Sequence, residues 1–68
     1  MIYLEPRKEF DLAIIDHETI TYSLTKIIEV LMDGGMSWID SMEWYCFNIE
    51  PLIQYVGLKV LDDEVESI

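Results

Sequence analysis

The residue types used in acid–base catalysis come together in one short segment, Asp16, His17 and Glu18. A catalytic histidine needs a carboxylate within hydrogen-bond reach to orient its ring. Neighbouring side chains on an extended chain point to opposite faces, so these three are not expected to converge. We interpret the segment as a solvated turn, and we expect no catalytic site and no enzymatic activity.

Cys46 is the single cysteine of the chain and His17 its single histidine. One cysteine excludes a disulfide within the chain, and zinc prefers several thiolate or imidazole ligands. A reactive thiol needs electropositive surroundings, whereas Glu43 and Glu50 flank Cys46 at about one helical turn on either side. The carboxylates also lack the alternating acidic loop with a central glycine that binds calcium. We therefore expect no metal site and no cofactor.

Charge is the strongest global signal in the 68 residues. Fourteen acidic residues stand against four basic ones, which gives a net charge of −10 at neutral pH. A field of this sign repels nucleic acids and anionic membranes and attracts basic protein surfaces. We expect a basic, nucleic-acid-binding host protein as partner, with no direct nucleic acid and no membrane. The alternative is that the charge serves only solubility.

The length allows one domain, which we place at residues 1–61, followed by an acidic tail at residues 62–68. A domain of this size is marginal on its own core, so it needs dense packing or self-association. The composition, 51% hydrophobic and 12% aromatic, suits both. No apolar stretch approaches the roughly 20 residues of a membrane span, and the first residues reach Glu5 without a secretory apolar region. The lone thiol indicates a reducing interior, so we expect a cytoplasmic protein.

The pattern of apolar residues predicts an α+β fold. Residues 1–4 are interpreted as a short strand, and residues 10–16 and 19–22 as the two strands of a β-hairpin. The β-prone residues 58–61 can add an edge strand. We expect this hairpin, or a three-stranded antiparallel sheet, to pack on a two-helix hairpin.

Two helices account for the middle of the chain. Ser23 is a candidate N-cap, and apolar residues then recur at helical spacing until Gly34 and Gly35 stop the helix. Ser37 is a candidate cap for a second helix over residues 38–48, which Pro51 breaks at Glu50. A short helical turn then follows and ends at Gly57.

The second helix is apolar on more than one side. Ile39, Trp44 and Phe47 lie off its main stripe, and such a helix is either enclosed or shared with a partner. A domain this small has little material to enclose it. We therefore consider a homodimer through helix 38–49 as one arrangement.

Three segments in the middle of the chain form a distinctive pattern. Residues 27–37 read I-I-E-V-L-M-D-G-G-M-S, residues 43–49 read E-W-Y-C-F-N-I, and residues 55–57 read Y-V-G. This pattern resembles a group of small, mostly uncharacterised proteins of tailed phages and prophages, which share the segments I-E-x-L-M-x-x-G-M-S/T, E-W/Y-x-x-F/Y-N-I and Y-V-G. The resemblance implies a phage protein acting in the host cytoplasm, and it implies no particular activity.

These observations give two hypotheses for function. The first is a phage-type protein that inhibits or redirects a host nucleic-acid-handling protein, such as a CRISPR effector, restriction enzyme, polymerase or nucleoid protein. Its carboxylates would imitate the phosphates of DNA, with aromatic residues as apolar anchors. The second is a homodimeric interaction or scaffold module. The candidate partner-binding residues are Glu29, Asp33, Asp40, Glu43, Trp44, Phe47 and Glu50.

Overall fold

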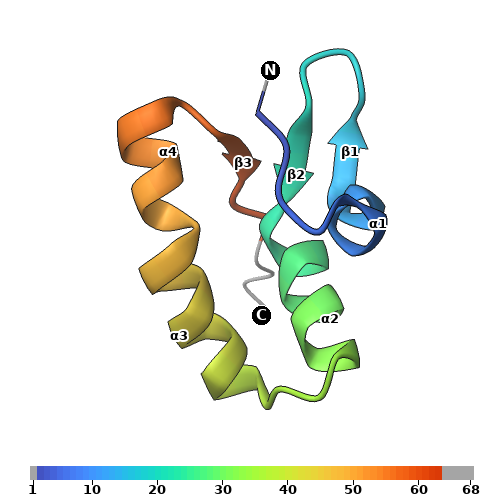
Figure 1. The fold of residues 1–68 in the computed structure, drawn as a ribbon, viewed down its shortest axis with the longest axis vertical. Coiled ribbons are helices and arrows are strands. Elements are labelled where there is room, and N and C mark those ends of the chain that lie inside the picture. Colours follow the sequence, from blue (N-terminus) through green and yellow to red (C-terminus); the bar gives the residue numbers. More distant parts are fainter. Residues whose placement is uncertain (1, 64–68) are drawn as a thin grey trace.

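The computed structural model describes residues 2–63 and has an α+β fold. In Figure 1, helix α2 leads away from a small sheet, and helices α3 and α4 lead back toward it. The predicted fold class is therefore confirmed. The elements in chain order are α1 (Arg7–Phe10), the 3-10 helix η1 (Asp11–Ala13), β1 (Ile14–Asp16), β2 (Thr21–Ser23), α2 (Leu24–Asp33), α3 (Trp38–Asn48), α4 (Glu50–Val56) and β3 (Lys59–Leu61).

The sheet has the strand order β1-β2-β3 and is mixed. Strands β1 and β2 form the predicted antiparallel hairpin, with Ile14 opposite Tyr22. The third strand lies where the sequence predicts it, but it pairs with β2 in parallel, with Tyr22 opposite Val60. The expectation of an antiparallel sheet is therefore wrong. The helices α2, α3 and α4 return the chain to the starting end of β2, so β3 runs in the same direction as β2.

The N-terminal strands predicted at residues 1–4 and 10–16 are also wrong in most of their length. Residues 2–4 are not in a strand, and helical turns occupy residues 7–13, so that only Ile14–Asp16 is extended. The carbonyl of Pro6 accepts hydrogen bonds from the backbone N–H groups of Glu9 and Phe10, which starts α1. An apolar run does not by itself separate a strand from a short buried helical segment.

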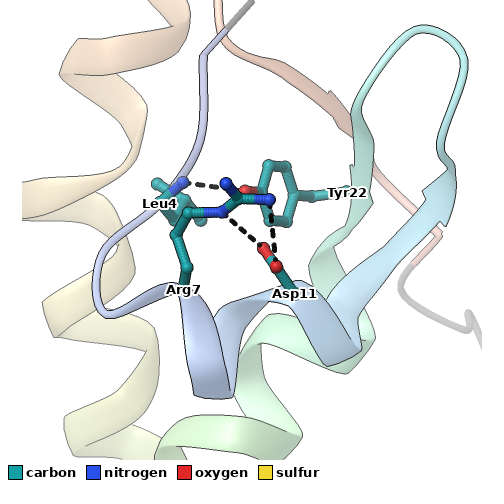
Figure 2. A network of polar contacts seen from close by, with 4 residues as sticks. All are labelled: Leu4, Arg7, Asp11 and Tyr22. Carbon is teal, nitrogen blue, oxygen red and sulfur yellow. Dashed lines mark hydrogen bonds and ion pairs between the residues drawn. The ribbon is translucent and has the colours of Figure 1, made fainter.

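A buried tyrosine ties this N-terminal segment to the sheet (Figure 2). The hydroxyl of Tyr22 accepts a hydrogen bond of 2.7 Å from the backbone N–H of Leu4. Burial raises the pKa of Tyr22, and the hydrogen bond from Leu4 opposes that rise. Nearby, Arg7 forms an ion pair of 3.2 Å with Asp11 and lies 3.7 Å above the centre of the Tyr3 ring.

The loop between β1 and β2 is the predicted polar turn. One carboxylate oxygen of Asp16 accepts hydrogen bonds from the backbone N–H groups of Glu18 and Thr19, at 2.9 and 3.3 Å. The loop ends at Ile20, which has a φ of 55° although its side chain is buried. A β-branched residue in this left-handed region costs about 1–3 kcal/mol, which the burial of the side chain offsets.

Helix α2 begins and ends as the sequence predicts. The Ser23 hydroxyl accepts a hydrogen bond from the backbone N–H of Lys26, and Gly34 forms the C-cap. The helix contacts η1, β2 and α3 and contributes four residues to the core. The packing of the sheet on a two-helix hairpin stays a prediction. The buried apolar residues are Leu4, Phe10, Ala13, Ile14, Ile20, Tyr22, Leu24, Ile27, Ile28, Leu31, Tyr45, Ile49 and Leu58.

The predicted caps of the second half of the chain are likewise confirmed, whereas the break predicted at Glu50 is wrong by one residue, because Glu50 already belongs to α4. Ser37 accepts a hydrogen bond of 3.1 Å from the backbone N–H of Asp40 and so caps α3. Ile49 keeps a right-handed helical conformation between α3 and α4, and Pro51 occupies the first turn of α4. Gly57 ends α4 with a φ of 82°, which favours glycine.

Candidate functional site

The outer face of α3 carries four of the predicted partner-binding residues. Asp40, Glu43 and Phe47 belong to α3, and Glu50 is the first residue of α4. Spacings of three, four and three residues place them on one side of a helix, and the helical conformation of Ile49 continues that side into α4. All four are exposed, and Phe47 is 78% exposed. We call Asp40, Glu43, Phe47 and Glu50 the acidic stripe.

The carboxylates of the acidic stripe have no cationic partner among residues 2–63. Among residues 2–63, an ion pair joins Arg7 to Asp11, and neither residue belongs to the stripe. Hydrogen bonding to Asp11, with the charges of nearby acidic residues, raises the pKa of Arg7 above its usual value. The negative charge of the stripe is therefore left for solvent or for a partner.

One buried residue lies directly behind the stripe. Tyr45 points from α3 into the core and is 6% exposed. Burial, and to a smaller extent the negative charges of Glu50 and Asp62, raise the pKa of Tyr45 to about 12. At neutral pH the Tyr45 hydroxyl therefore stays protonated, and its side chain packs in the core.

Trp44 adjoins the stripe along α3, but its ring is engaged by another element. Its ring stacks on that of Phe10 in α1, with ring centres 6.0 Å apart and an angle of 13° between the planes. The side chain is half-buried, so it joins α3 to α1. The two predicted apolar anchors therefore differ in their surroundings, because Trp44 packs on α1 whereas Phe47 is exposed.

The two predicted contacts on α2 face different hollows. Both are exposed, but Glu29 lines a hollow of about 360 Å³ between α2 and α3 together with Met32 and Trp38. Asp33 lines another hollow, near Leu12 of η1. The structure therefore brings Asp40, Glu43, Phe47 and Glu50 together and places Glu29, Asp33 and Trp44 elsewhere.

Asp63 has a structural role that the sequence did not indicate. Its carboxylate accepts hydrogen bonds from the hydroxyl of Ser23 at 2.5 Å and from the backbone N–H of Thr25 at 3.0 Å. Partial burial alone would raise the pKa of Asp63, but the hydrogen bonds from Ser23 and Thr25 outweigh it and lower the pKa. The expected acidic tail therefore has its second residue fixed at the start of α2, and residues 64–68 lie outside the described residues. Sequence reasoning missed this contact because 38 positions separate Asp63 from Thr25.

The histidine and the cysteine of the chain, His17 and Cys46, lie at the surface. Within residues 2–63, no three His, Cys, Asp or Glu side chains gather in a way that could hold a metal ion. The helices of this part of the chain are also too short or too polar to cross a membrane.

Comparisons of the chain with protein families, curated proteins and solved structures found no match. The candidate site therefore stands on the geometry and charge of the acidic stripe.

Proposed function

We propose that this chain is a small acidic binding protein of phage type that inhibits or redirects a host nucleic-acid-handling protein. The observation that carries the proposal is the acidic stripe, where an exposed aromatic ring stands among three carboxylates without cationic partners in residues 2–63. A basic surface made for phosphates complements this arrangement.

The stripe imitates nucleic acid only in part. Asp40 and Glu50 are ten positions apart, which corresponds to about 15 Å along a helix. One DNA strand places a phosphate every 3.4 Å or so, and it would carry more charges over this length than the stripe does. The carboxylates therefore supply attraction and orientation. Phe47 supplies affinity, because burying such a ring contributes about 1.5–3 kcal/mol.

The partner can be sought directly. Tagged protein is incubated with nuclease-treated host lysate, the bound proteins are eluted with rising salt, and mass spectrometry identifies them. We expect one dominant basic protein that handles nucleic acid. An empty or diffuse eluate would contradict the proposal and favour charge that serves solubility.

The surface is then tested with two variants of equal net charge. One variant, Asp40→Asn/Glu43→Gln/Glu50→Gln, neutralises the stripe. The control, Glu18→Gln/Glu64→Gln/Glu66→Gln, removes three carboxylates that belong neither to the stripe nor to the other candidate contacts. We expect the stripe variant to bind the captured protein at least about tenfold more weakly and the control to stay within about threefold. Equal affinities of the two variants would show that the stripe is not the contact surface.

A homodimer through helix 38–49 is a second candidate, favoured by the exposure of Ile39 and Phe47, which are 64% and 78% exposed. A two-fold interface on this face would bring the two stripes close together, so their charges would repel. We expect such a dimer to strengthen with salt, whereas binding to a basic partner weakens with salt. Sedimentation at low and high salt separates the two, and a monomer under both conditions would exclude the dimer.

A further inference from the structure

A groove runs along the side of α2 that faces α1, and none of its lining residues belongs to the acidic stripe. It consists of two adjoining hollows of about 210 and 250 Å³, which share Glu9, Val30 and Gly34 in their linings. One hollow extends toward Leu12 of η1 and the other toward Trp44 of α3. We call these two hollows the α1–α2 groove.

The floor of the groove is apolar and held in place. Phe10 and Leu31 lie in the core and line the hollow that extends toward Trp44, and Trp44 is fixed there by its stacking on Phe10. Leu12 is 74% exposed at the far end, which is costly for an unpartnered side chain of this size. Gly34 contributes no side chain, so the floor stays open where the two hollows meet.

The charge around the groove has one sign. Glu5, Glu9 and Asp33 line it, and no lysine, arginine or histidine of residues 2–63 does. These carboxylates form no ion pair with a side chain of the described chain, and the nearby Arg7 is engaged by Asp11. Glu5 interacts with Arg7 only through its charge, without an ion pair. An apolar floor below an acidic rim complements a ligand that is both apolar and cationic.

The size of the hollows favours a protein side chain over a small organic ligand. Pockets for drug-sized molecules measure about 300–1,000 Å³, and each hollow is smaller. A single large apolar side chain suits such a hollow, with its neighbours along the chain reaching the rim.

We propose that the α1–α2 groove binds a basic segment of a partner protein, in which a leucine or phenylalanine enters the groove and flanking lysines or arginines meet Glu5, Glu9 and Asp33. This surface is separate from the acidic stripe, so it extends the proposed function to a second contact.

The test uses a synthetic peptide of about ten residues, with lysines and arginines around one central phenylalanine. It is titrated into the isotopically labelled full chain, and the signals of the Gly34 amide and the Trp44 indole are followed by NMR. Two further ligands are titrated alongside, the same peptide with alanine at the centre and the polyamine spermine. We expect saturable shifts at Gly34 and Trp44 with the phenylalanine peptide, and at least about tenfold weaker binding of the other two ligands.

Three variants locate the binding. Gly34→Leu fills the groove without changing charge; the backbone of Gly34 has a negative φ of −82°, and a Cβ there would lie 3.4 Å from the Leu31 carbonyl oxygen, an ordinary contact. Glu5→Gln/Glu9→Gln/Asp33→Asn removes the rim charges, and the stripe variant Asp40→Asn/Glu43→Gln/Glu50→Gln removes the same number elsewhere. We expect the first two to weaken peptide binding at least about tenfold and the third to stay within about threefold.

Equal losses in the two charge variants, or equal binding of spermine and the phenylalanine peptide, would overturn the proposal, because either result means that the overall negative field attracts the peptide. NMR signal changes that centre on Glu43 and Phe47, or changes that do not saturate with added peptide, would overturn the proposal as well. The peptide assay does not use a host protein, so a failure of the groove and a failure to capture a nucleic-acid-handling partner are distinguishable.

Discussion

Helices α2 and α3 have nearly the same length, 10 and 11 residues, but they use their apolar side chains differently. Helix α2 buries Leu24, Ile27, Ile28 and Leu31 against the rest of the domain. Helix α3 buries only Ser41 and Tyr45 and leaves Trp38, Ile39 and Phe47 more than half exposed. The apolar side chains of α2 are buried and so stabilise the fold. Helix α3 carries more apolar side chains than the core buries, and exposed apolar groups of this kind mark interaction surfaces.

The largest effect on the free energy of unfolding is expected for a buried side chain of α2, and an exposed side chain of α3 serves for comparison. Ile27→Ala in α2 removes a fully buried side chain, and we expect the free energy of unfolding to fall by about 2–5 kcal/mol. Phe47→Ala in α3 removes a larger side chain, yet we expect a change of less than about 0.5 kcal/mol. Urea denaturation of both variants measures the difference. A comparable loss in Phe47→Ala would show that the ring contributes to folding, and the acidic stripe would lose its apolar anchor.

The next largest effect on the free energy of unfolding is expected at Tyr22, and Tyr55 serves for comparison. Tyr22→Phe leaves the buried N–H of Leu4 without its acceptor, and we expect a loss of about 1–3 kcal/mol in the free energy of unfolding. Tyr55→Phe in α4 is the matched control, because its side chain is 81% exposed and its loss should be near zero. If the two substitutions have equal effects, the hydrogen bond between Leu4 and Tyr22 does not hold the N-terminal segment.

A smaller effect, with a defined pH dependence, is expected at the start of α2. Asp63→Asn weakens the hydrogen bonds to Ser23 and Thr25, and we expect a loss of about 1 kcal/mol at neutral pH. Because the pKa of Asp63 is lowered in the folded protein, its carboxylate stabilises the fold above the unfolded pKa of about 4. That contribution disappears as the pH falls through the folded pKa.

Thermal unfolding of the natural chain and of Asp63→Asn between neutral and acidic pH checks this sign. The gap between the two proteins should close on acidification. Glu18→Gln serves as the control, since its exposed side chain should show no such gap. A gap that widens at low pH would contradict the role of the ionised carboxylate.

The smallest effect is a gain in stability within α3. The hydroxyl of Ser41 is fully buried and has no hydrogen-bond partner among the described residues. Ser41→Ala removes this unsatisfied group and favours the helix, so we expect a gain of about 0.5–1 kcal/mol. Chemical denaturation measures the gain, and a loss of stability would indicate that the hydroxyl is satisfied in solution.

Much of the helical architecture could be predicted because its signals are local. Ser23, Ser37 and Gly57 act within a few positions of themselves, and each has the predicted role. The apolar spacing of α2 also predicted its buried face correctly. The N-terminal segment could not be predicted in this way, because the apolar run around Ala13 and Ile14 suits both a strand and the helical turns that Pro6 begins.

The candidate site likewise has a part that local spacing predicts and a part that depends on tertiary packing. Helical spacing alone is sufficient to place Asp40, Glu43 and Phe47 on one face. Glu50 joins them because Ile49 keeps a helical conformation, against the break predicted from Pro51. No spacing rule relates Trp44 to Phe10, since their stacking depends on how α1 packs against α3. The separation of the predicted contacts into a stripe and two hollows therefore had to come from the structure.

The sequence by itself determined the charge of the protein, the caps and ends of its long helices and the spacing of Asp40, Glu43 and Phe47 on α3, because these depend on composition and on neighbours within one or two helical turns. Only the tertiary structure decided the parallel pairing of β3 with β2, the contact of Asp63 with the start of α2 and the α1–α2 groove. Each of these joins segments far apart along the chain, and their meeting depends on how the helices return the chain to the sheet.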